Sequence, residues 1–339
     1  MRSEEAVKCV VRPEEISVEC SVDVFFLNGL GDQLLVRPAL SALCAIFPDR
    51  VRLLCPRGLH EVFFSGLPFR AVTEFDYWFE DGSFCFVPSA LPAADGTKGL
   101  FISLAPWEAP SLAQARRELK PVQSVGFGDN YDVAIPLDFT KHSALLAFDV
   151  PLAYRSDLRF EDYTEPPQLP SWAIESARRI FHSLAPRSLR IVIHADSKPE
   201  KMWPTASWLE TIHQLLSTYD DLRIFLVGYD HPVFAATRIS SRVRALYSLP
   251  LPVSLALVSM ADAFVGIDSV ILHSADFFRI PSVGLFGPTR AEEFGFLFSG
   301  NRTLQGAGRM DAISVDACVQ AVQDLLAEAL KPDTLAARS

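Results

Sequence analysis

The first candidate for chemistry is an aspartate at a junction that contains two glycines. The apolar run of residues 22–27 leads into Gly29, Gly31 and Asp32, and a helical pattern begins at Gln33. Glycine permits positive φ or close approach of the backbone to a ligand, and the free amides of the helix would face the same space. A carboxylate at this junction therefore lies where it could act on a bound ligand. Aspartate is also a preferred N-cap residue, so a purely structural capping role for Asp32 stays open.

A polar loop in the second half of the chain, residues 194–204, contains groups suited to a phosphate. It carries Asp196, Ser197 and Lys201 and closes with a Trp-Pro pair. A lysine can hold a phosphate as a point charge, and a hydroxyl can donate a hydrogen bond to it. We therefore expect this loop to lie at a binding site.

Two further polar turns follow predicted strands. Asp268, Ser269 and His273 occupy the start of one predicted helix, and Thr289 follows a Gly-Pro pair. The free amides at the start of that helix suit a diphosphate. Structural explanations stay open as well, because Asp268 and Ser269 could cap the helix, His273 could be a core histidine and Gly-Pro is a common turn.

The segments that must position these residues alternate between strands and helices, as in an α/β protein. We expect strands at residues 22–27, 51–55, 69–73, 83–87, 100–104, 124–127, 133–136, 190–195, 223–228, 263–267 and 282–287. The expected helices cover residues 33–40, 111–119, 143–152 and 316–330, one that begins at 205, and a short one between the last two strands. In open parallel sheets ligands bind beyond the carboxyl ends of the strands, so the three polar turns of the second half should share one edge.

With 339 residues the chain is long enough for two domains. We predict an N-terminal α/β domain over residues 1–155, a linker over 156–170 and a C-terminal α/β domain over 171–339. The linker is polar and rich in proline, which is typical of a domain boundary. The last predicted helix, residues 316–330, could pack back on the first domain.

The composition is that of a globular protein, with 49% apolar and 21% charged residues. The net charge of −10 argues against a surface that binds nucleic acid. A local basic group at Arg116, Arg117 and Lys120 is interpreted as a solvated helix face. Apolar runs stay short of the ~18 residues that span a bilayer, and the first residues do not resemble a signal peptide. We expect a cytoplasmic protein without a transmembrane segment, with peripheral membrane contact left open.

The six cysteines are scattered along the chain without the spacing of a zinc site. No Cys-x-x-Cys pair or cluster of histidine and cysteine occurs among them. We therefore expect buried or free thiols, no metal site and no cofactor.

The order of these motifs resembles glycosyltransferase family 9, which contains the ADP-heptose:lipopolysaccharide heptosyltransferases. The resemblance rests on residues 31–40, 194–204, 268–273 and 286–289. It spans roughly residues 22–330. The resemblance implies an α/β chain with the GT-B fold, in which two Rossmann-like domains with parallel sheets face each other across a cleft.

The resemblance also implies an inverting transfer of a sugar, heptose or similar, from a nucleotide diphosphate donor to an acceptor hydroxyl. Asp32 matches the general base and Lys201 matches the lysine that neutralises the leaving diphosphate. The donor-binding residues implied in this way are Gly29, Gly31, Asp196, Ser197, Lys201, Asp230, Asp268, Ser269, His273 and Thr289. The chain contains no Asp-x-Asp triplet, which is consistent with a metal-independent reaction. The donor is expected to be ADP-heptose or another nucleotide diphosphate sugar.

Three positions depart from the pattern of the family. Val270 stands where the family usually has glycine, which affects the approach of the backbone to the phosphates. Asp230 is a substitute for the acidic residue that holds the nucleoside. The family's Asp-Leu-Gln-Gly stretch is replaced by residues 103–107, so an unusual acceptor is expected. The candidate acceptor-binding residues are Arg57, Trp107 and Arg116.

The acidic character of the chain bears on the acceptor. Enzymes that act on anionic lipopolysaccharide at a membrane gain from a basic face, so we hypothesise a soluble metabolite, a protein or a natural product as acceptor. Lipopolysaccharide core glycan remains the default for the family. Two other classes stay open: a pyruvyl transferase or nucleotide-sugar epimerase on the same scaffold, and a non-catalytic protein that binds a sugar nucleotide.

Overall fold

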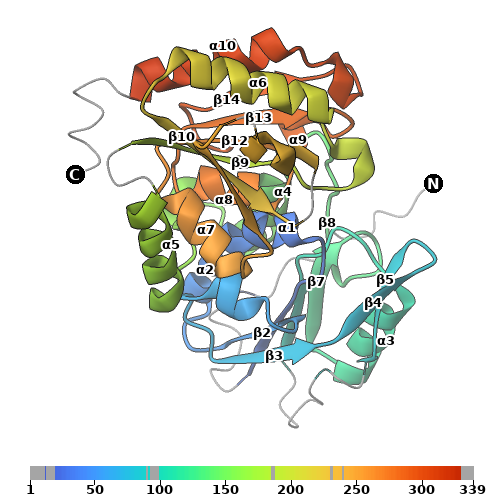
Figure 1. Cartoon of the computed structure of the whole chain (residues 1–339). Helices are drawn as coiled ribbons and strands as arrows, with labels where there is room; N and C mark the ends of the chain where they lie inside the picture. The colour runs from blue at the N-terminus through green and yellow to red at the C-terminus, as the bar shows by residue number, and fades with distance from the viewer. Residues whose placement is uncertain are drawn as a thin grey trace. The chain divides into compact units, whose positions relative to one another are not determined.

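The computed structural model describes residues 12, 20–88, 91, 99–184, 188–229, 232–238 and 240–329. The chain divides into two compact units, Met1–Gln168 and Leu169–Ser339. Each unit is built around one six-stranded parallel sheet (Figure 1). The division between the units falls inside the proline-rich segment 156–170.

The first sheet has the strand order β3-β2-β1-β6-β7-β8, and each neighbouring pair is parallel. Its strands are β1 (Val22–Phe25), β2 (Val51–Pro56), β3 (Ala71–Phe75), β6 (Leu100–Ser103), β7 (Gln123–Phe127) and β8 (Val133–Ile135). A short antiparallel hairpin of β4 (Tyr77–Glu80) and β5 (Ser83–Phe86) follows β3. The central strand β1 is buried along its whole length, as expected for a parallel strand covered on both faces.

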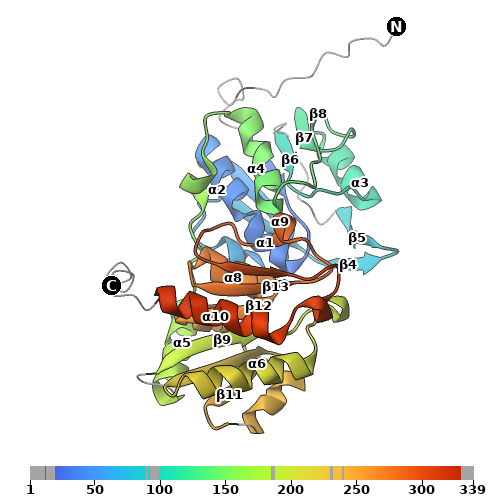
Figure 2. The same ribbon diagram turned by 90° about the horizontal axis from the view of Figure 1, so that it is seen from above.

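The helices of the first unit are α1 (Leu30–Leu35), α2 (Arg37–Ile46), the π-helix η2 (His60–Phe64), α3 (Pro110–Leu119), α4 (Ser143–Tyr154) and the 3₁₀-helix η4 (Phe160–Tyr163). Helices α2 and α4 pack against each other (Figure 2), and α3 contacts β5. The rings of Phe25 and Phe75 stack, and the Phe86 ring is tilted against both, in an aromatic core that also contains apolar residues of α3.

The segment proposed as a linker is partly held on the first unit. Arg37 is buried, and its guanidinium donates to the carbonyl oxygens of Glu165, Pro166 and Phe63 at 2.9, 3.3 and 2.8 Å. Burial lowers the pKa of Arg37 to about 10, against the opposing charge of Glu165. Because a buried arginine needs these acceptors, the bonds fix residues 165 and 166 beside α2.

The second sheet has the order β11-β10-β9-β12-β13-β14 and is also parallel throughout. Its strands are β9 (Leu189–His194), β10 (Leu222–Gly228), β11 (Val243–Tyr247), β12 (Ala263–Ile267), β13 (Ser282–Phe286) and β14 (Arg302–Gln305). The helices are α5 (Ser171–Leu184), η5 (Pro199–Lys201), α6 (Thr205–Thr218), η6 (Pro232–Arg238), α7 (Leu251–Ser259), α8 (Val270–Phe277), α9 (Ala291–Phe294), η7 (Met310–Ala312) and α10 (Val315–Ala329).

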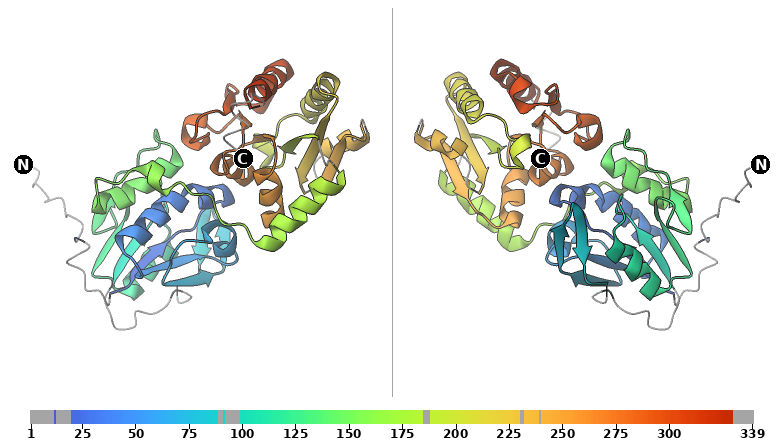
Figure 3. Two further views of the ribbon diagram at one scale, coloured as in Figure 1. Left: turned by 90° about the vertical axis from the view of Figure 1, so that its left-hand side faces the viewer. Right: turned by 90° about the vertical axis from the view of Figure 1, so that its right-hand side faces the viewer.

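Helices cover both faces of the second sheet. Helices α6 and α10 pack together on one face, and α5, α7 and α8 lie on the other (Figure 3). The buried side chains of α10 at Cys318, Val322, Leu325 and Leu326 belong to the core of this unit. The last helix, considered above as a contact to the first domain, therefore uses its apolar stripe within the second unit.

The predicted α/β architecture with two Rossmann-like parallel sheets is confirmed. Both sheets have the same strand order. The first strand is central, the next two are added outward on one side of it, and the last three are added outward on its other side. This reversal lies between β1 and β6 in the first sheet and between β9 and β12 in the second. In doubly wound sheets ligands bind at the carboxyl ends of the strands at this reversal. The sequence analysis did not predict strands β4, β11 and β14 or helices α5, α7 and α9.

Candidate active site

The aspartate junction lies at the reversal point of the first sheet, directly after β1. Helix α1 begins at Leu30 with Gly29 as its N-cap residue, so Asp32 lies inside the first turn and the proposal that it caps the helix is wrong. Gly29 has φ −56° and Gly31 is helical, so neither glycine uses the positive φ that was considered. The glycine at position 29 provides space instead, because a Cβ there would lie 3.2 Å from Asp32 Oδ2.

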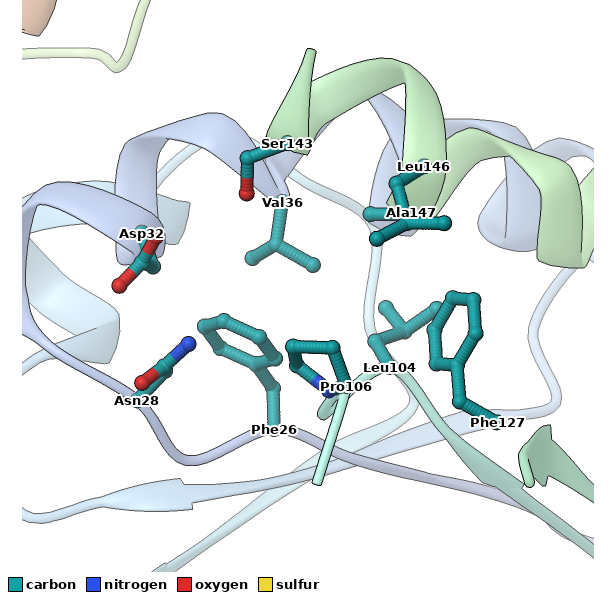
Figure 4. Close-up of a pocket in the computed structure, with 10 residues that line it drawn as sticks. All are labelled: Phe26, Asn28, Asp32, Val36, Leu104, Pro106, Phe127, Ser143, Leu146 and Ala147. Atoms are coloured by element: carbon teal, nitrogen blue, oxygen red, sulfur yellow. The ribbon is translucent and has the colours of Figure 1, made fainter. Parts of the chain in front are cut away.

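Asp32 lines a small pocket at the carboxyl end of β1 that has room for about one water molecule. Figure 4 shows Asp32 and Asn28 at one end of this pocket, with Leu146, Ala147 and Phe127 at the other. The remaining lining residues are Phe26, Val36, Leu104, Pro106 and Ser143. The pocket therefore joins a carboxylate to a largely apolar wall.

The residues around this pocket are fixed by local hydrogen bonds. Gln33 is fully buried, and its Nε2 donates to the carbonyl of Asn28 at 3.0 Å. His142 caps α4, because its Nδ1 accepts from the amide of Ala144 at 3.2 Å. This cap begins the helix at Ser143, a lining residue that the sequence analysis missed. The sequence feature that could have identified it is a serine hydroxyl at the first position of an apolar helix, directly after the last strand of the first sheet.

A second polar cluster lies at the reversal point of the second sheet. Lys201, after β9, donates from Nζ to Asp268 Oδ2 at 2.6 Å. His273 Nε2 lies 3.5 Å from Asp268 Oδ1. The side chains of Asp268 and His273 are buried, whereas that of Lys201 is 23% exposed. The structure therefore brings together three residues that are separated by up to 72 positions in sequence.

The start of α8 explains how Asp268 is held. Ser269 is the N-cap residue of α8, and its Oγ accepts from the amide of Leu272 at 3.4 Å. Ser269 therefore takes the capping role that was considered for the pair, and the Asp268 carboxylate remains available to Lys201. Ser197 also contributes, because its hydroxyl donates to the Asp268 carbonyl at 3.2 Å.

The electrostatics of the cluster favour a charged Asp268. Burial by itself would raise the pKa of Asp268, but the hydrogen bond and charge of His273 and those of Lys201 outweigh it. The pKa of this carboxyl is held well below its usual range. The cluster thus contains a permanent buried anion beside a partly exposed cation.

The remaining donor candidates lie around these residues. Asp196 Oδ2 accepts from the amide of Tyr229 at 2.7 Å, which ties the loop after β9 to the end of β10. Thr289 follows β13, and its carbonyl accepts from Gln305 Nε2 at 3.2 Å. Its buried hydroxyl finds no hydrogen-bond partner within the part of the chain that the structure describes. Asp230 lies outside the described residues.

The three acceptor candidates occupy different environments. Arg57 is exposed and pairs with Asp76 at 2.9 Å. Trp107 stacks on Phe84, with ring centroids 5.3 Å apart. The structure therefore places Arg57 in solvent and Trp107 against the hairpin strand β5.

Arg116 is not part of a solvated helix face, and that interpretation is wrong for this residue. Its side chain is 13% exposed and pairs with Glu108 at 2.9 Å. The guanidinium also lies 4.3 Å above the centroid of the Tyr131 ring. Arg117, on the same helix, and Lys120, its C-cap residue, are exposed as expected.

Residues 148–315 match the model of glycosyltransferase family 9 (heptosyltransferase). Over this stretch, just under half of its length, the chain is similar to glycosyltransferase family 9. No curated protein matches it in a sequence search.

Solved family 9 structures share the fold. A family 9 glycosyltransferase from Veillonella parvula has a TM-score of 0.73 and 16% identity, covering 91% of this chain and 98% of its own. ADP-heptose lipopolysaccharide heptosyltransferase II from E. coli has a TM-score of 0.70 and 16% identity, with 91% and 99% covered. The E. coli heptosyltransferase WaaC with ADP has a TM-score of 0.65 and 14% identity, with 90% and 99% covered. The fold is therefore GT-B.

The family 9 match contains the polar cluster of the second unit but not the pocket of the first. Asp196, Lys201, Asp268 and His273 lie inside residues 148–315, whereas Asp32 lies outside them. Among the described residues, no group of three or more histidine, cysteine, aspartate or glutamate side chains could hold a metal ion. None of the described helices is long and apolar enough to cross a membrane.

Proposed function

We propose that this protein is a family 9 glycosyltransferase that moves a heptose-like sugar from a nucleotide diphosphate donor to an acceptor hydroxyl, with inversion at the anomeric carbon. The observation that carries the proposal is the position of Asp32 on a pocket at the reversal point of the first sheet. Asp32 accepts the proton of the acceptor hydroxyl while the oxygen of that hydroxyl forms a bond to the anomeric carbon of the donor sugar. The bond from that carbon to the diphosphate breaks, and the diphosphate leaves with the electron pair.

The donor is proposed to bind the second unit at the cluster of Lys201, Asp268 and His273. Lys201 neutralises charge on the leaving diphosphate, since it is the partly exposed cation of that cluster. Asp268 positions the lysine by the hydrogen bond at 2.6 Å. The amides at the start of α8 add a favourable partial charge for phosphate.

ADP-heptose is the proposed donor, and Asp196, Ser197, Asp230, Ser269, Thr289, Gly29 and Gly31 are the further proposed donor-binding residues. Support comes from the solved structures of WaaC, one with ADP and one with ADP-2-deoxy-2-fluoro heptose. We propose a reaction without a metal ion or cofactor, in which lysine and helix amides serve the leaving group. The acceptor is a glycan, a protein or a small metabolite, and the proposed location is the cytoplasm.

A screen of nucleotide sugars by mass spectrometry tests the proposal. We expect the full chain to release nucleotide diphosphate from ADP-heptose when an acceptor pool is added. Formation of an altered nucleotide sugar without acceptor would indicate an epimerase instead. Failure to bind any nucleotide sugar in a thermal-shift panel would overturn the proposed function.

The role of Asp32 is tested by Asp32→Asn. We expect donor affinity to be retained and turnover to fall by roughly 10²–10⁴, the usual effect of losing a general base. Asp49→Asn is the matched control, because Asp49 is exposed and its φ of 57° suits asparagine. Full activity of Asp32→Asn would remove the assignment of the base.

A further inference from the structure

The hairpin of β4 and β5 carries three large aromatic side chains in a row on β4. Tyr77, Trp78 and Phe79 are 42%, 46% and 64% exposed. A strand that packs on a core buries every second side chain, so an exposed run of three apolar residues is unfavourable unless it serves a function. We propose that the outer edge of β4 binds a cationic segment of another polypeptide as an added strand.

The hairpin holds β4 in place because β5 is anchored on the core of the first unit. Phe86 of β5 is buried, and its ring centroid lies 5.3 and 5.0 Å from those of Phe25 and Phe75. Phe84 stacks on Trp107 at 5.3 Å. Figures 1 and 2 show the hairpin at the periphery of this unit. The core therefore presents β4 to solvent as a formed strand.

The side of β4 that faces away from β5 is an open strand edge, because β4 pairs only with β5 among the described strands. The two strands are joined by Asp81 and Gly82, whose φ values of 48° and 76° suit a tight hairpin turn. Backbone amides and carbonyls along such an edge can pair with an added strand. Lysine or proline often protects an edge from this pairing, and β4 contains neither.

The charge of the hairpin favours a cationic partner. Residues 71–87 contain four acidic residues and no lysine or arginine. Within the part of the chain that the structure describes, no lysine or arginine forms an ion pair with Glu80 or Asp81. Glu80 Oε2 accepts from Trp78 Nε1 at 2.9 Å, which places a carboxylate beside an exposed indole. Lysine and arginine side chains suit this pair, through ion pairing and cation–π contact.

The same charge disfavours two other occupants of the edge. A second copy that paired through its own β4 would bring Glu80 and Asp81 against identical carboxylates, and like charges repel at close range. An anionic membrane would be repelled for the same reason. Arg57 does not compensate these charges, because it already pairs with Asp76 at 2.9 Å. A cationic polypeptide meets neither obstacle.

The two faces of β4 predict the sequence pattern of the partner. Tyr77 and Phe79 lie on one face with Phe84, at centroid distances of 6.0 and 5.3 Å, and Trp78 and Glu80 lie on the other. Side chains of an added strand alternate in the same way. We expect apolar side chains beside Tyr77 and Phe79 and cations beside Trp78 and Glu80. The partner segment should therefore alternate between apolar and cationic residues.

A set of three short peptides tests the proposal on the full chain. In these hexapeptides, acetylated and amidated at their ends, valine alternates with arginine, with glutamate or with serine. Fluorescence anisotropy of the labelled peptides measures binding. We expect saturable binding of the arginine peptide, weakened by added salt, and roughly tenfold weaker binding, or none, of the other two.

A charge variant of the hairpin assigns this binding to β4. Glu80→Gln combined with Asp81→Asn removes both charges, since glutamine keeps an acceptor for Trp78 and asparagine suits the positive φ at position 81. The affinity for the arginine peptide should fall by roughly threefold or more, the scale of two exposed ion pairs. The matched control, Asp220→Asn with Asp221→Asn, changes the net charge equally at exposed residues of the second unit and should bind normally.

An apolar variant tests the aromatic part of the surface. Phe79→Thr removes the most exposed of the three rings and keeps a residue that favours strands. The affinity for the arginine peptide should fall by roughly tenfold, the scale of losing one apolar contact of this size. Val122→Thr is the control, because Val122 is 59% exposed in the first unit and lies outside the hairpin. Urea denaturation verifies that each variant is folded.

The proposal is overturned if the arginine peptide does not bind at millimolar concentration, or if the serine or glutamate peptide binds as tightly. It is also overturned if the folded hairpin variants bind the arginine peptide like their controls. Sedimentation equilibrium that shows a dimer lost in Phe79→Thr would assign the edge to a second copy instead. Because the titration needs no donor, absence of sugar transfer would reject the proposed function and leave this test intact.

Discussion

Asp268 is the residue around which the polar cluster of the second unit is organised. Its carboxylate is buried and touches both Lys201 and His273, while its carbonyl accepts from Ser197. A buried anion is costly without partners, and removal of one partner exposes that cost. The three side chains therefore stabilise the folded chain only when all of them are present. Lys201 contributes to this stability and also to the proposed reaction.

The dual role of the lysine predicts the effect of Lys201→Ala. We expect turnover to fall by roughly 10²–10³, the range for loss of one stabilising group at a developing anion. The free energy of unfolding should also fall, by about 3 kcal/mol or less, because Asp268 loses a buried ion pair. Nucleotide release and urea denaturation measure the two effects.

Lys198→Ala is the control for that experiment. Lys198 lies on the same loop but is exposed. Normal turnover in Lys201→Ala, or an equal loss in both variants, would contradict a specific role for Lys201.

At the scale of elements, the loop after β9 is held by an aromatic anchor. Trp203 is buried, lies edge-on to Trp208 at 5.0 Å, and donates from Nε1 to the carbonyl of Ile313 at 3.1 Å. This bond links the loop that carries Lys201 to the chain just before α10. The position of the lysine therefore depends on a residue that takes no part in the proposed chemistry.

Trp203→Phe should lower the free energy of unfolding by roughly 1–3 kcal/mol. The carbonyl of Ile313 would stay buried without its donor, and such a group costs about that much. Trp172→Phe is the control, because Trp172 is 51% exposed on α5. Urea denaturation measures both variants, and equal stabilities would show that the bond to Ile313 contributes nothing.

Helix α8 carries a second buried carboxyl that joins it to the segment before β14. Asp276 accepts from the amide of Leu297 at 2.7 Å and from Asn301 Nδ2 at 2.8 Å. Burial raises the pKa of Asp276 to about 6, although the backbone hydrogen bonds from Leu297 and Phe298 and the charges of His273 and Arg279 oppose the shift. Folding therefore takes up a proton at this carboxyl between pH ~4 and pH ~6.

The sign of this linkage predicts how stability depends on pH. The contribution of Asp276 is fully present below pH ~4 and is lost as the pH rises through ~6, by roughly 2–3 kcal/mol. Denaturation of the unmodified chain and of Asp276→Asn from pH 4 to 7 should give curves that diverge over this window. Asp221→Asn, at an exposed aspartate of the same unit, should give a curve parallel to that of the unmodified chain. A parallel curve for Asp276→Asn would contradict the raised pKa.

At the scale of the whole molecule, both units use one strand order and place their polar residues at the same point of it. Asp32 follows the central strand of the first sheet, and Lys201 and Asp268 follow the two strands at the reversal of the second. A doubly wound sheet leaves a crevice there because successive helices lie on opposite faces. The repeated topology thus gives each unit one natural place for a ligand.

The net charge of −10 predicts weak binding of the chain to anionic membranes. At pH 7.4 and 0.15 M salt we expect no sedimentation with vesicles of anionic phosphatidylglycerol and neutral phosphatidylcholine, because the net charge is repelled. Binding should grow when the pH falls below the isoelectric point of about 5.2. Sedimentation at pH 7.4 would show a local cationic or apolar surface that outweighs the net charge.

The elements that the sequence predicted well are those with a strong apolar pattern. Strands β1, β9, β10, β12 and β13 are nearly continuous apolar runs, which only a covered parallel strand explains. Strand β14 reads Arg-Thr-Leu-Gln, and α7 is apolar on all sides, so neither shows the period of its own structure. These elements form because neighbouring strands and helices bury them, which a local pattern does not record.

The sequence by itself determined the α/β class, the order of the motifs and the residues that follow the strands, because strand ends and glycine turns are local features. It also placed Lys201, Asp268 and His273 at one edge of the second sheet, because they follow its predicted strands. Only the tertiary structure decided that Asp268 contacts both Lys201 and His273, that Asp32 lies inside a helix turn, and that Arg116 packs over the Tyr131 ring. Contacts between distant segments depend on how the strands are ordered and how the helices pack on them, and no periodicity within one segment encodes that order.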